Sequence, residues 1–183
     1  MIRLLLFLMF AAFPLFHQNW ESIHERIIND ETLVVPGMGA EKIIIHEPVA
    51  ILNSTYQGLD YRLAKVGDNQ DVFRDILKIN NKNGIVFNEI RYFYGNNVVV
   101  FIKNNIVQSV AGMNTDRITL DSVDLGRGAS YFVFNYGNES LTVYKKPNGY
   151  VYIYAAKGIA VFDDDNDDSI DLYMVFPAVN RIK

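Results

Sequence analysis

The chain has 183 residues, of which 50% are hydrophobic, and a net charge of −4. This length and composition exclude an intrinsically disordered chain and predict a packed core in one compact domain or two small ones. The 17 Lys and Arg residues are scattered, so no basic stripe predicts nucleic-acid binding. Cysteine is absent, which excludes disulfides, thiolate metal ligands and cysteine nucleophiles and leaves the redox compartment open.

The N-terminus has the pattern of a signal peptide or membrane anchor. Arg3 precedes the apolar run LLLFLMFAAFPLF, which is short for a bilayer because a spanning helix needs about 20 residues. Its small residues, Ala11 and Ala12, make a poor cleavage site, so an uncleaved anchor stays open, and a buried helix is the alternative. We expect residues 1–18 to direct export to the periplasm, cell surface or medium and to provide the only membrane contact.

Residues 19–40 are predicted to be a helical spacer followed by a linker. Trp20, Ile23 and Ile27 recur at the spacing of an amphipathic helix. The stretch GMGAEK, residues 37–42, has two glycines and a lysine but lacks the spacing of a phosphate-binding loop. We therefore interpret it as a flexible connection to the main domain, residues 41–183.

A divergent repeat with a period of about 60 residues is predicted in the main domain, extending over about 41–114 and about 115–180. KVGDNQDVFRDIL and DLGRGASYFVFNYG share a Gly, at 67 and 126, with an aromatic residue at 73 and 132. RYFYGNNVVVFIKNNIVQSVAGM then matches VYIYAAKGIAVFDDDNDDSIDLYMVF. The aligned pairs are Tyr92 with Tyr152, Tyr94 with Tyr154, Phe101 with Phe162 and Val110 with Tyr173. Chance similarity between aromatic-rich strands is the alternative.

The predicted fold is α+β, with a short helix packed on an antiparallel meander of three or four strands in each repeat. EKIIIHEPVAIL, residues 41–52, adds one or two strands before the first repeat. Its helix is capped by Asp68 or Asn69 and includes Phe73. Its strands are EIRYFYG, NVVVFIKN and IVQSVAG. RITLDSVDL forms a hairpin before the second repeat, whose helix is SYFVFNYG and whose strands are YVYIYAA, GIAVFD and IDLYMVFP.

The Gly after an apolar residue, the capped helix, the Tyr-containing strand, GIAVF and the closing IDLYMVF together resemble two families. Over residues 60–177 the chain looks like the outer-membrane-assembly small lipoproteins and the tandem-repeat inhibitors of β-lactamase. It is also similar to small two-repeat immunity partners of toxins. The resemblance implies an exported protein that binds another protein through its sheet face and loops and is not an enzyme. The lipobox cysteine and the paired cysteines of these families are missing here, so no family binding residue can be mapped.

No pattern in the sequence predicts a catalytic residue or a cofactor site. His24-Glu25 lacks the second histidine of a zinc-protease helix, because Ile28 stands in its place. A catalytic histidine activates a nucleophile or binds a metal, and the sequence has no such motif for His46. Ser130 lacks the following glycine of a nucleophile elbow. Paired carboxylates could still act as an acid and a base, so a hydrolase of an extracellular polymer remains an alternative.

The stretch VFDDDNDDSIDLY partly matches a calcium-binding loop. Positions 1, 3, 5, 7 and 9 of such a loop are filled by Asp163, Asp165, Asp167, Ser169 and Asp171. Asp168 stands where the turn needs Gly, and Met174 where the loop needs a closing Glu. We also expect the strand that follows to draw Asp171 out of the loop. The sequence therefore predicts a charged hairpin tip without a metal site, with weak calcium binding by Asp163, Asp165, Asp167 and Asp171 left open.

The sequence predicts an exported, non-catalytic module that binds another protein and needs no cofactor. Tyr92, Tyr94, Tyr152 and Tyr154 are the expected contact residues, because alternation sends one set of side chains outward unless both faces of the sheet are covered. A toxin-immunity-type inhibitor, a carboxylate-dependent hydrolase and a weak calcium-binding protein are the alternatives.

Overall fold

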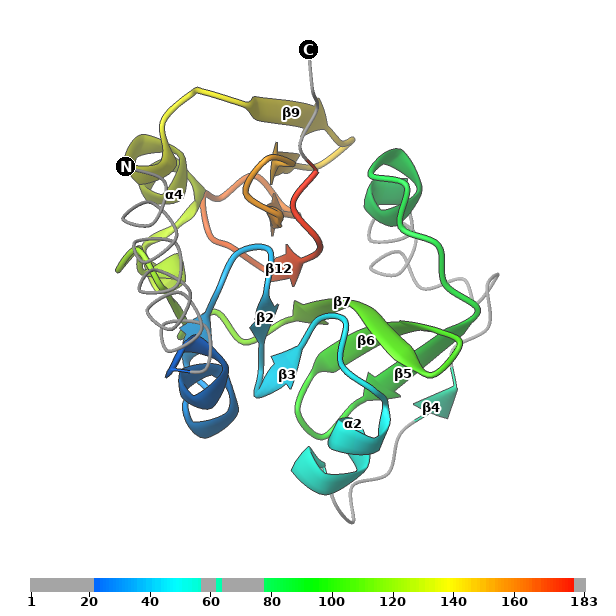
Figure 1. Cartoon of the computed structure of the whole chain (residues 1–183). Coiled ribbons are helices and arrows are strands. Elements are labelled where there is room, and N and C mark those ends of the chain that lie inside the picture. Colours follow the sequence, from blue (N-terminus) through cyan, green and yellow to red (C-terminus); the bar gives the residue numbers. More distant parts are fainter. Residues whose placement is uncertain (1–21, 57–61, 64–77, 180–183) are drawn as a thin grey trace, which may run out of the picture.

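An eight-stranded antiparallel sheet runs through the computed structural model, which describes residues 22–56, 62–63 and 78–179 (Figure 1). In spatial order the strands are β4 (Arg62–Leu63), β5 (Glu89–Phe93), β6 (Val98–Lys103), β7 (Ile106–Gly112), β12 (Leu172–Val175), β11 (Ile159–Asp163), β10 (Tyr150–Tyr154) and β9 (Leu141–Lys145). The predicted α+β class with a mainly antiparallel sheet is confirmed.

The six predicted meander strands are confirmed as β5, β6 and β7 and as β10, β11 and β12. These strands form where apolar residues alternate with polar ones or follow one another without a break, and each strand ends where turn residues follow. Asn104 and Asn105 have φ values of 51° and 64°, which gives the β6–β7 connection two left-handed residues, and Gly158 has φ 75° between β10 and β11.

The two meanders have the same ladder register about a seam between β7 and β12. Val100 lies between Arg91 and Val110, and Val161 lies between Tyr152 and Tyr173. The same holds one residue further along, where Phe101 lies between Ile90 and Ser109, and Phe162 between Val151 and Leu172. At the seam Ala111 faces Met174.

Both faces of the sheet are covered. One face packs against α2 (Ala50–Thr55), α4 (Ala129–Tyr136) and the small hairpin of β2 (Gly39–Ala40) and β3 (Ile43–Ile44). The other packs against the helical residues 78–82 and the segment that follows them. Phe132 is fully buried on the first face, as predicted, and α4 ends at Gly137. Covering both faces leaves the edges of the sheet as its accessible parts.

Residues 37–52 differ from their prediction in two ways. We expected 37–42 to be a flexible linker, but Gly37 N–H donates to the carbonyl of Gly158 at 3.2 Å, and Ala40 is fully buried. We also expected one or two strands in 41–52: one, β3, forms, and Leu52 is instead buried on α2. The β2–β3 pair belongs to a separate two-stranded sheet. The reason is packing, because the apolar residues of this segment complete one face of the core.

The N-terminal part of the described chain also packs on the domain. Residues 22–29 are helical, as predicted for the spacer, and Ile27 is fully buried. β1 (Leu33–Val34) pairs in parallel with β8 (Ile118–Thr119), after which the predicted hairpin turns at Ser122. A short 3₁₀ helix, η1 (Leu125–Arg127), leads into α4. The predicted export segment, residues 1–18, and the first-repeat helix with Gly67 and Phe73 lie outside the described residues.

Candidate functional site

The acidic stretch forms the tip of the β11–β12 hairpin, as predicted. β11 and β12 pair antiparallel on either side of it, with Phe162 opposite Leu172. The tip is shaped by its own hydrogen bonds: Asp163 Oδ1 accepts from Asn166 N at 2.6 Å, and Asp171 Oδ2 accepts from Asp164 N at 2.6 Å. These bonds satisfy backbone N–H groups that have no ladder partner.

One aspartate of the tip caps α4 from outside the helix. Asp168 Oδ1 accepts from Ser130 N at 2.8 Å, and the Asp168 carbonyl accepts from Ala129 N at 2.8 Å. The residue before the helix, Gly128, has φ 95°, and a Cβ atom there would lie 2.5 Å from the Asp168 carbonyl oxygen. The carboxylate and the carbonyl of Asp168 therefore satisfy two orphan N–H donors at the positive end of the helix. Asp168 thus has a structural role that local sequence signals did not reveal.

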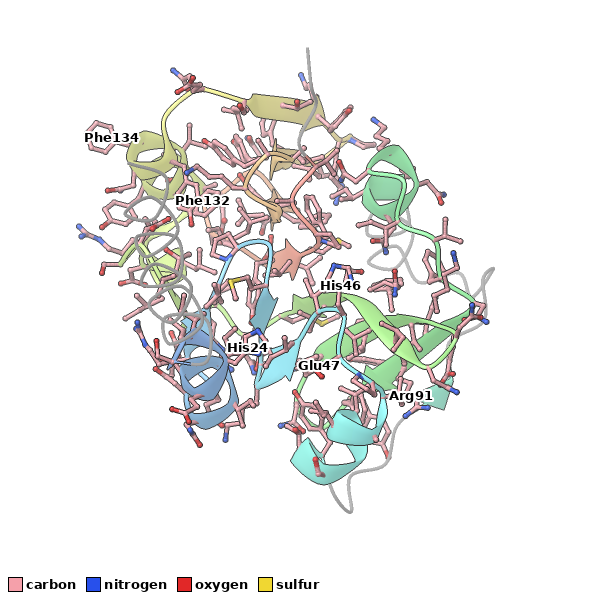
Figure 2. All side chains as sticks on the ribbon, viewed as in Figure 1. His24, His46, Glu47, Arg91, Phe132 and Phe134 are labelled. Atoms are coloured by element: carbon pink, nitrogen blue, oxygen red, sulfur yellow. The ribbon has the colours of Figure 1, made fainter. Side chains whose placement is uncertain are left out.

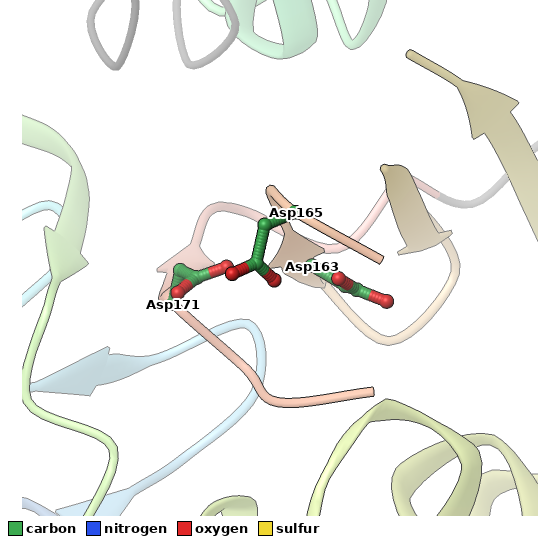
Figure 3. Close-up of side chains that lie close together, drawn as sticks. All are labelled: Asp163, Asp165 and Asp171. Carbon is green, nitrogen blue, oxygen red and sulfur yellow. The ribbon is translucent and has the colours of Figure 1, made fainter. Parts of the chain in front are cut away.

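Three other carboxylates of the tip lie together. Asp163, Asp165 and Asp171 place their oxygens within 4.8 Å of one another, with Asp165 between the other two (Figure 3). Asp171 thus remains in the loop, contrary to our expectation, because β12 begins only at Leu172. Asp167 instead accepts bonds from Ser169.

Burial raises the pKa of Asp171, and the charges of Asp164, Asp165 and Asp167 raise it further. Carboxylate oxygens in this arrangement are of the kind that hard divalent cations prefer. Asp163 and Asp171 already accept backbone hydrogen bonds within the tip, and exposed acidic groups commonly cluster without an ion. The geometry alone therefore adds no metal site to the prediction.

A buried ion pair that sequence reasoning missed lies at the seam. Glu41, in the β2–β3 turn, accepts from Arg117 Nε at 2.9 Å and from Arg117 Nη2 at 3.1 Å. The hydroxyl of Tyr173 donates to the same carboxylate, and that of Tyr56 donates to the Glu41 carbonyl at 2.8 Å. Burial raises the pKa of Tyr173 well above its usual range, and the Glu41 charge raises it further, so the phenol stays a donor. These groups are fully occupied with one another, which makes this cluster structural.

β9 is a strand at the open edge of the sheet, and the sequence did not predict it. In the part of the chain that the structure describes, its strand partner is β10 alone. The signals for it were the alternating Leu141 and Val143 and the turn residues Pro147, Asn148 and Gly149. They were weak because the alternation is short: Lys145 stands where the next apolar residue is expected.

The outward backbone groups of β9 follow from the hairpin geometry. Lys146 N donates to the Gly149 carbonyl at 2.8 Å, so these two residues form a bonded pair of the ladder. Bonded and non-bonded pairs alternate in an antiparallel ladder. Tyr144 therefore belongs to a bonded pair, whereas Val143 and Lys145 belong to the intervening pairs. Val143 and Lys145 direct their N–H and C=O groups away from β10, toward the open edge.

Exposed apolar side chains lie on β9 itself and, separately, on α4. Val143 is 47% exposed on the α4 face of the sheet, and Tyr144 is 36% exposed on the opposite face. On α4, Phe134 is 83% exposed and points away from the body of the protein, whereas Phe132 points inward (Figure 2). Exposed apolar groups beside unpaired strand groups are characteristic of surfaces that bind other chains.

The tyrosines predicted to form a binding face are distributed differently. Tyr154 is fully buried and donates to the Gly137 carbonyl at 2.7 Å, and Tyr94 is exposed beyond β5. Tyr92 and Tyr152 are half-buried on opposite faces, because Tyr92 packs with one core cluster and Tyr152 with the other. Their predicted equivalence is therefore wrong by one residue, since the ladders match Tyr92 with Ile153. His46 is exposed two residues after the end of β3.

No protein-family model matches the chain, and no curated protein matches it. Among solved structures, it is similar to the uncharacterized protein yfeY from Escherichia coli, with a TM-score of 0.46 and 9% sequence identity. The similarity covers 80% of this chain and 99% of that one. Across the described residues, each helix falls short of the length and apolar character needed to cross a bilayer.

Proposed function

We propose that this chain is an exported, non-catalytic module that binds another protein by accepting a strand of the partner at the open edge of β9. The observation that carries this proposal is the row of outward N–H and C=O groups at Val143 and Lys145, flanked by exposed Val143 and Tyr144. An extended peptide can pair with such an edge, because its backbone gains hydrogen bonds while its side chains reach the groups on either face.

The domain that presents this edge is proposed to be a tandem repeat. The equal ladder registers of the two meanders support a duplicated unit, with Phe101 matching Phe162 and Val110 matching Tyr173 about the seam. The two units differ in one respect, because β4 precedes the helical residues 78–82 whereas β9 follows α4. Among the described residues, the five-residue edge strand belongs to the second unit.

Export rests on residues 1–18, whose single arginine and apolar run support a signal peptide or an anchor. The test is a chain lacking residues 1–18 alongside the full chain in cell fractionation. We expect the full chain outside the cytoplasm and the shortened chain to stay in the cytoplasm, soluble and folded. Aggregation of the shortened chain would show that the segment belongs to the core.

The edge is tested with Val143→Pro, which removes an outward N–H and keeps the ladder to β10 intact. Val143→Thr is the matched control, because it keeps the N–H and has a similar size. Each protein serves as bait in a cell-envelope extract, and partners that bind the wild type are then purified and titrated directly. We expect the proline variant to weaken binding at least about tenfold and the threonine variant to leave it unchanged. Equal binding by all three baits would contradict strand addition.

A further inference from the structure

A pocket of about 520 Å³ adjoins the open edge of β9 on the Tyr144 face. It lies between the helical residues 78–82 and the β9–β10 hairpin. Its lining residues are Lys78, Ile79, Lys82, Tyr144, Lys145, Lys146, Pro147 and Val151. Buried Ile79 and Val151 give it an apolar floor.

Four of the eight lining residues are lysines, and none is acidic. Lys78 and Lys82 are one turn apart on the same helix face, while Lys145 ends β9 and Lys146 follows it. Of the latter two, Lys146 shares the face of Tyr144, because Lys145 lies on the face of Val143. This concentration of positive charge is unusual in a chain whose net charge is −4. It was not predicted, because the two pairs are far apart in sequence and meet only through the fold.

Two lysines that line the pocket already contact groups of the protein itself. Lys82 Nζ lies 3.1 Å from the ring centroid of Tyr144, so a lysine of one wall covers an aromatic ring of the other. Lys146 Nζ lies 2.5 Å from Asp164 Oδ1, so a carboxylate is already bound at one corner of this basic surface. Ammonium groups over an apolar floor favour a ligand that combines carboxylates with apolar groups.

Strand addition would place alternate side chains of a partner over this pocket. Neighbouring side chains on adjacent strands share a face, with Cβ atoms about 5 Å apart. The partner residue opposite Tyr144 and those two positions away therefore lie on the lysine side. The residues between them lie on the other face, beside exposed Val143.

We infer that the partner supplies an extended segment in which acidic and apolar residues alternate, with its carboxylates over Lys78, Lys82 and Lys146 and its apolar side chains beside Val143. This inference rests on the proposed function and specifies the chemistry of its partner. The charge complementarity between the lysine pocket and an acidic strand selects this occupant over a neutral or basic one.

The probe is a fluorescently labelled octapeptide of alternating valine and glutamate, titrated with the protein by anisotropy. Peptides of alternating valine and glutamine, or valine and lysine, are the sequence controls. We expect the glutamate peptide to bind at least about tenfold more tightly than the glutamine peptide at about 50 mM salt, with the difference shrinking at about 500 mM salt. The lysine peptide is expected not to bind.

Variants of the protein separate the two layers of the inference. Lys78→Gln with Lys82→Gln should weaken the glutamate peptide about tenfold, whereas the control pair Lys42→Gln with Lys103→Gln, which has the same charge change, should not. Val143→Pro should abolish binding of the glutamate and glutamine peptides alike.

If the lysine substitutions have no effect but Val143→Pro does, the acidic specificity is wrong and strand addition stands. If the lysine substitutions weaken binding but Val143→Pro does not, the pocket binds acids without an added strand and the proposed edge is wrong. If neither peptide binds, both proposals fail.

Discussion

Val161 and Val143 face the same residue, Tyr152, from the two strands that flank it, yet Val161 is fully buried and Val143 is 47% exposed. Residue type and neighbour are the same, so the position of the strand in the sheet decides the burial. β11 is covered on both faces, whereas β9 lies at the edge. The core and the open edge are thereby separated: the inner strands supply the core, whereas among the described residues β9 has a strand partner on one side alone.

The seam gives the strongest way to test this separation. Arg117→Met leaves the buried Glu41 carboxylate without its partner and should lower the free energy of unfolding by about 3–5 kcal/mol. Lys42→Met, which breaks an exposed pair with Glu31, should cost less than about 1 kcal/mol. Denaturant unfolding measures both. A double variant, Glu41→Gln with Arg117→Met, should recover part of the loss. Equal losses from Arg117→Met and Lys42→Met would mean that burial of the ion pair does not determine its contribution to stability.

The two valines give a matched test of moderate size. Val161→Ala removes buried methyl groups and leaves a cavity, so we expect a loss of about 2–3 kcal/mol. Val143→Ala should change the free energy of unfolding by no more than about 0.5 kcal/mol. Both are measured by urea unfolding. Similar losses would mean that β9 is part of the core and would remove the basis for edge binding.

One carboxylate of the acidic tip, that of Asp168, stabilises α4. Asp168→Ala removes the cap on Ser130 and should cost about 1 kcal/mol, measured by thermal unfolding. Faster amide exchange at Ser130 should accompany the loss. Asp167→Ala removes the same charge but only a local bond to Ser169, and we expect a smaller effect. Equal losses would indicate that the cap on Ser130 contributes no more than the local bond to Ser169.

The raised pKa of Asp171 predicts a smaller, pH-dependent effect. A carboxyl whose pKa is raised by folding stabilises the folded state when protonated, and this contribution is lost as the pH rises through the folded pKa. Asp171→Asn should therefore stabilise the protein by a few tenths of a kcal/mol at pH 7, after allowing for solvent screening. At about pH 3 the two proteins should be equally stable, because Asp171 is then mostly protonated. Unfolding at the two pH values measures this. If Asp171→Asn stabilised the protein more at the acid pH than at pH 7, the proposed direction of the pKa shift would be wrong.

Calcium should have the smallest effect. The tip lacks the turn glycine and the closing glutamate, and Asp168 is committed to α4, so we expect a shift in melting temperature below about 1 °C at micromolar calcium. Folding is expected not to require the ion. Saturable stabilisation of several degrees, lost in Asp165→Ala and not reproduced by magnesium, would make the tip a metal site.

The meanders and α4 could be predicted because their signals are local. Apolar alternation and the turns at Asn104–Asn105 and Gly158 are encoded within a few residues of each strand. The apparent pairing of Tyr92 with Tyr152 failed because aromatic spacing on a strand does not report its face. One residue of slip moves a side chain to the opposite side of the sheet.

The site could not be predicted because its parts meet only in the fold. Glu41 and Arg117 lie 76 positions apart in the chain, and both pairs of lysines are ordinary surface residues in the sequence. β9 was not predicted because its apolar alternation extends over Leu141 and Val143 alone before Lys145 interrupts it. Residues 37–42 suggested a linker through their glycines, whereas packing of the neighbouring apolar residues brings them into the core.

The seam between β7 and β12 also bears on how the chain folds. Each meander pairs strands that are neighbours along the chain, and such hairpins close within microseconds. The seam instead joins Gly112 to Tyr173, so its closure must restrict a long stretch of chain before any hydrogen bond is gained. We expect docking of the two preformed meanders to be the slow step. Substitutions at Ala111 or Met174 should then slow refolding more than substitutions within either hairpin.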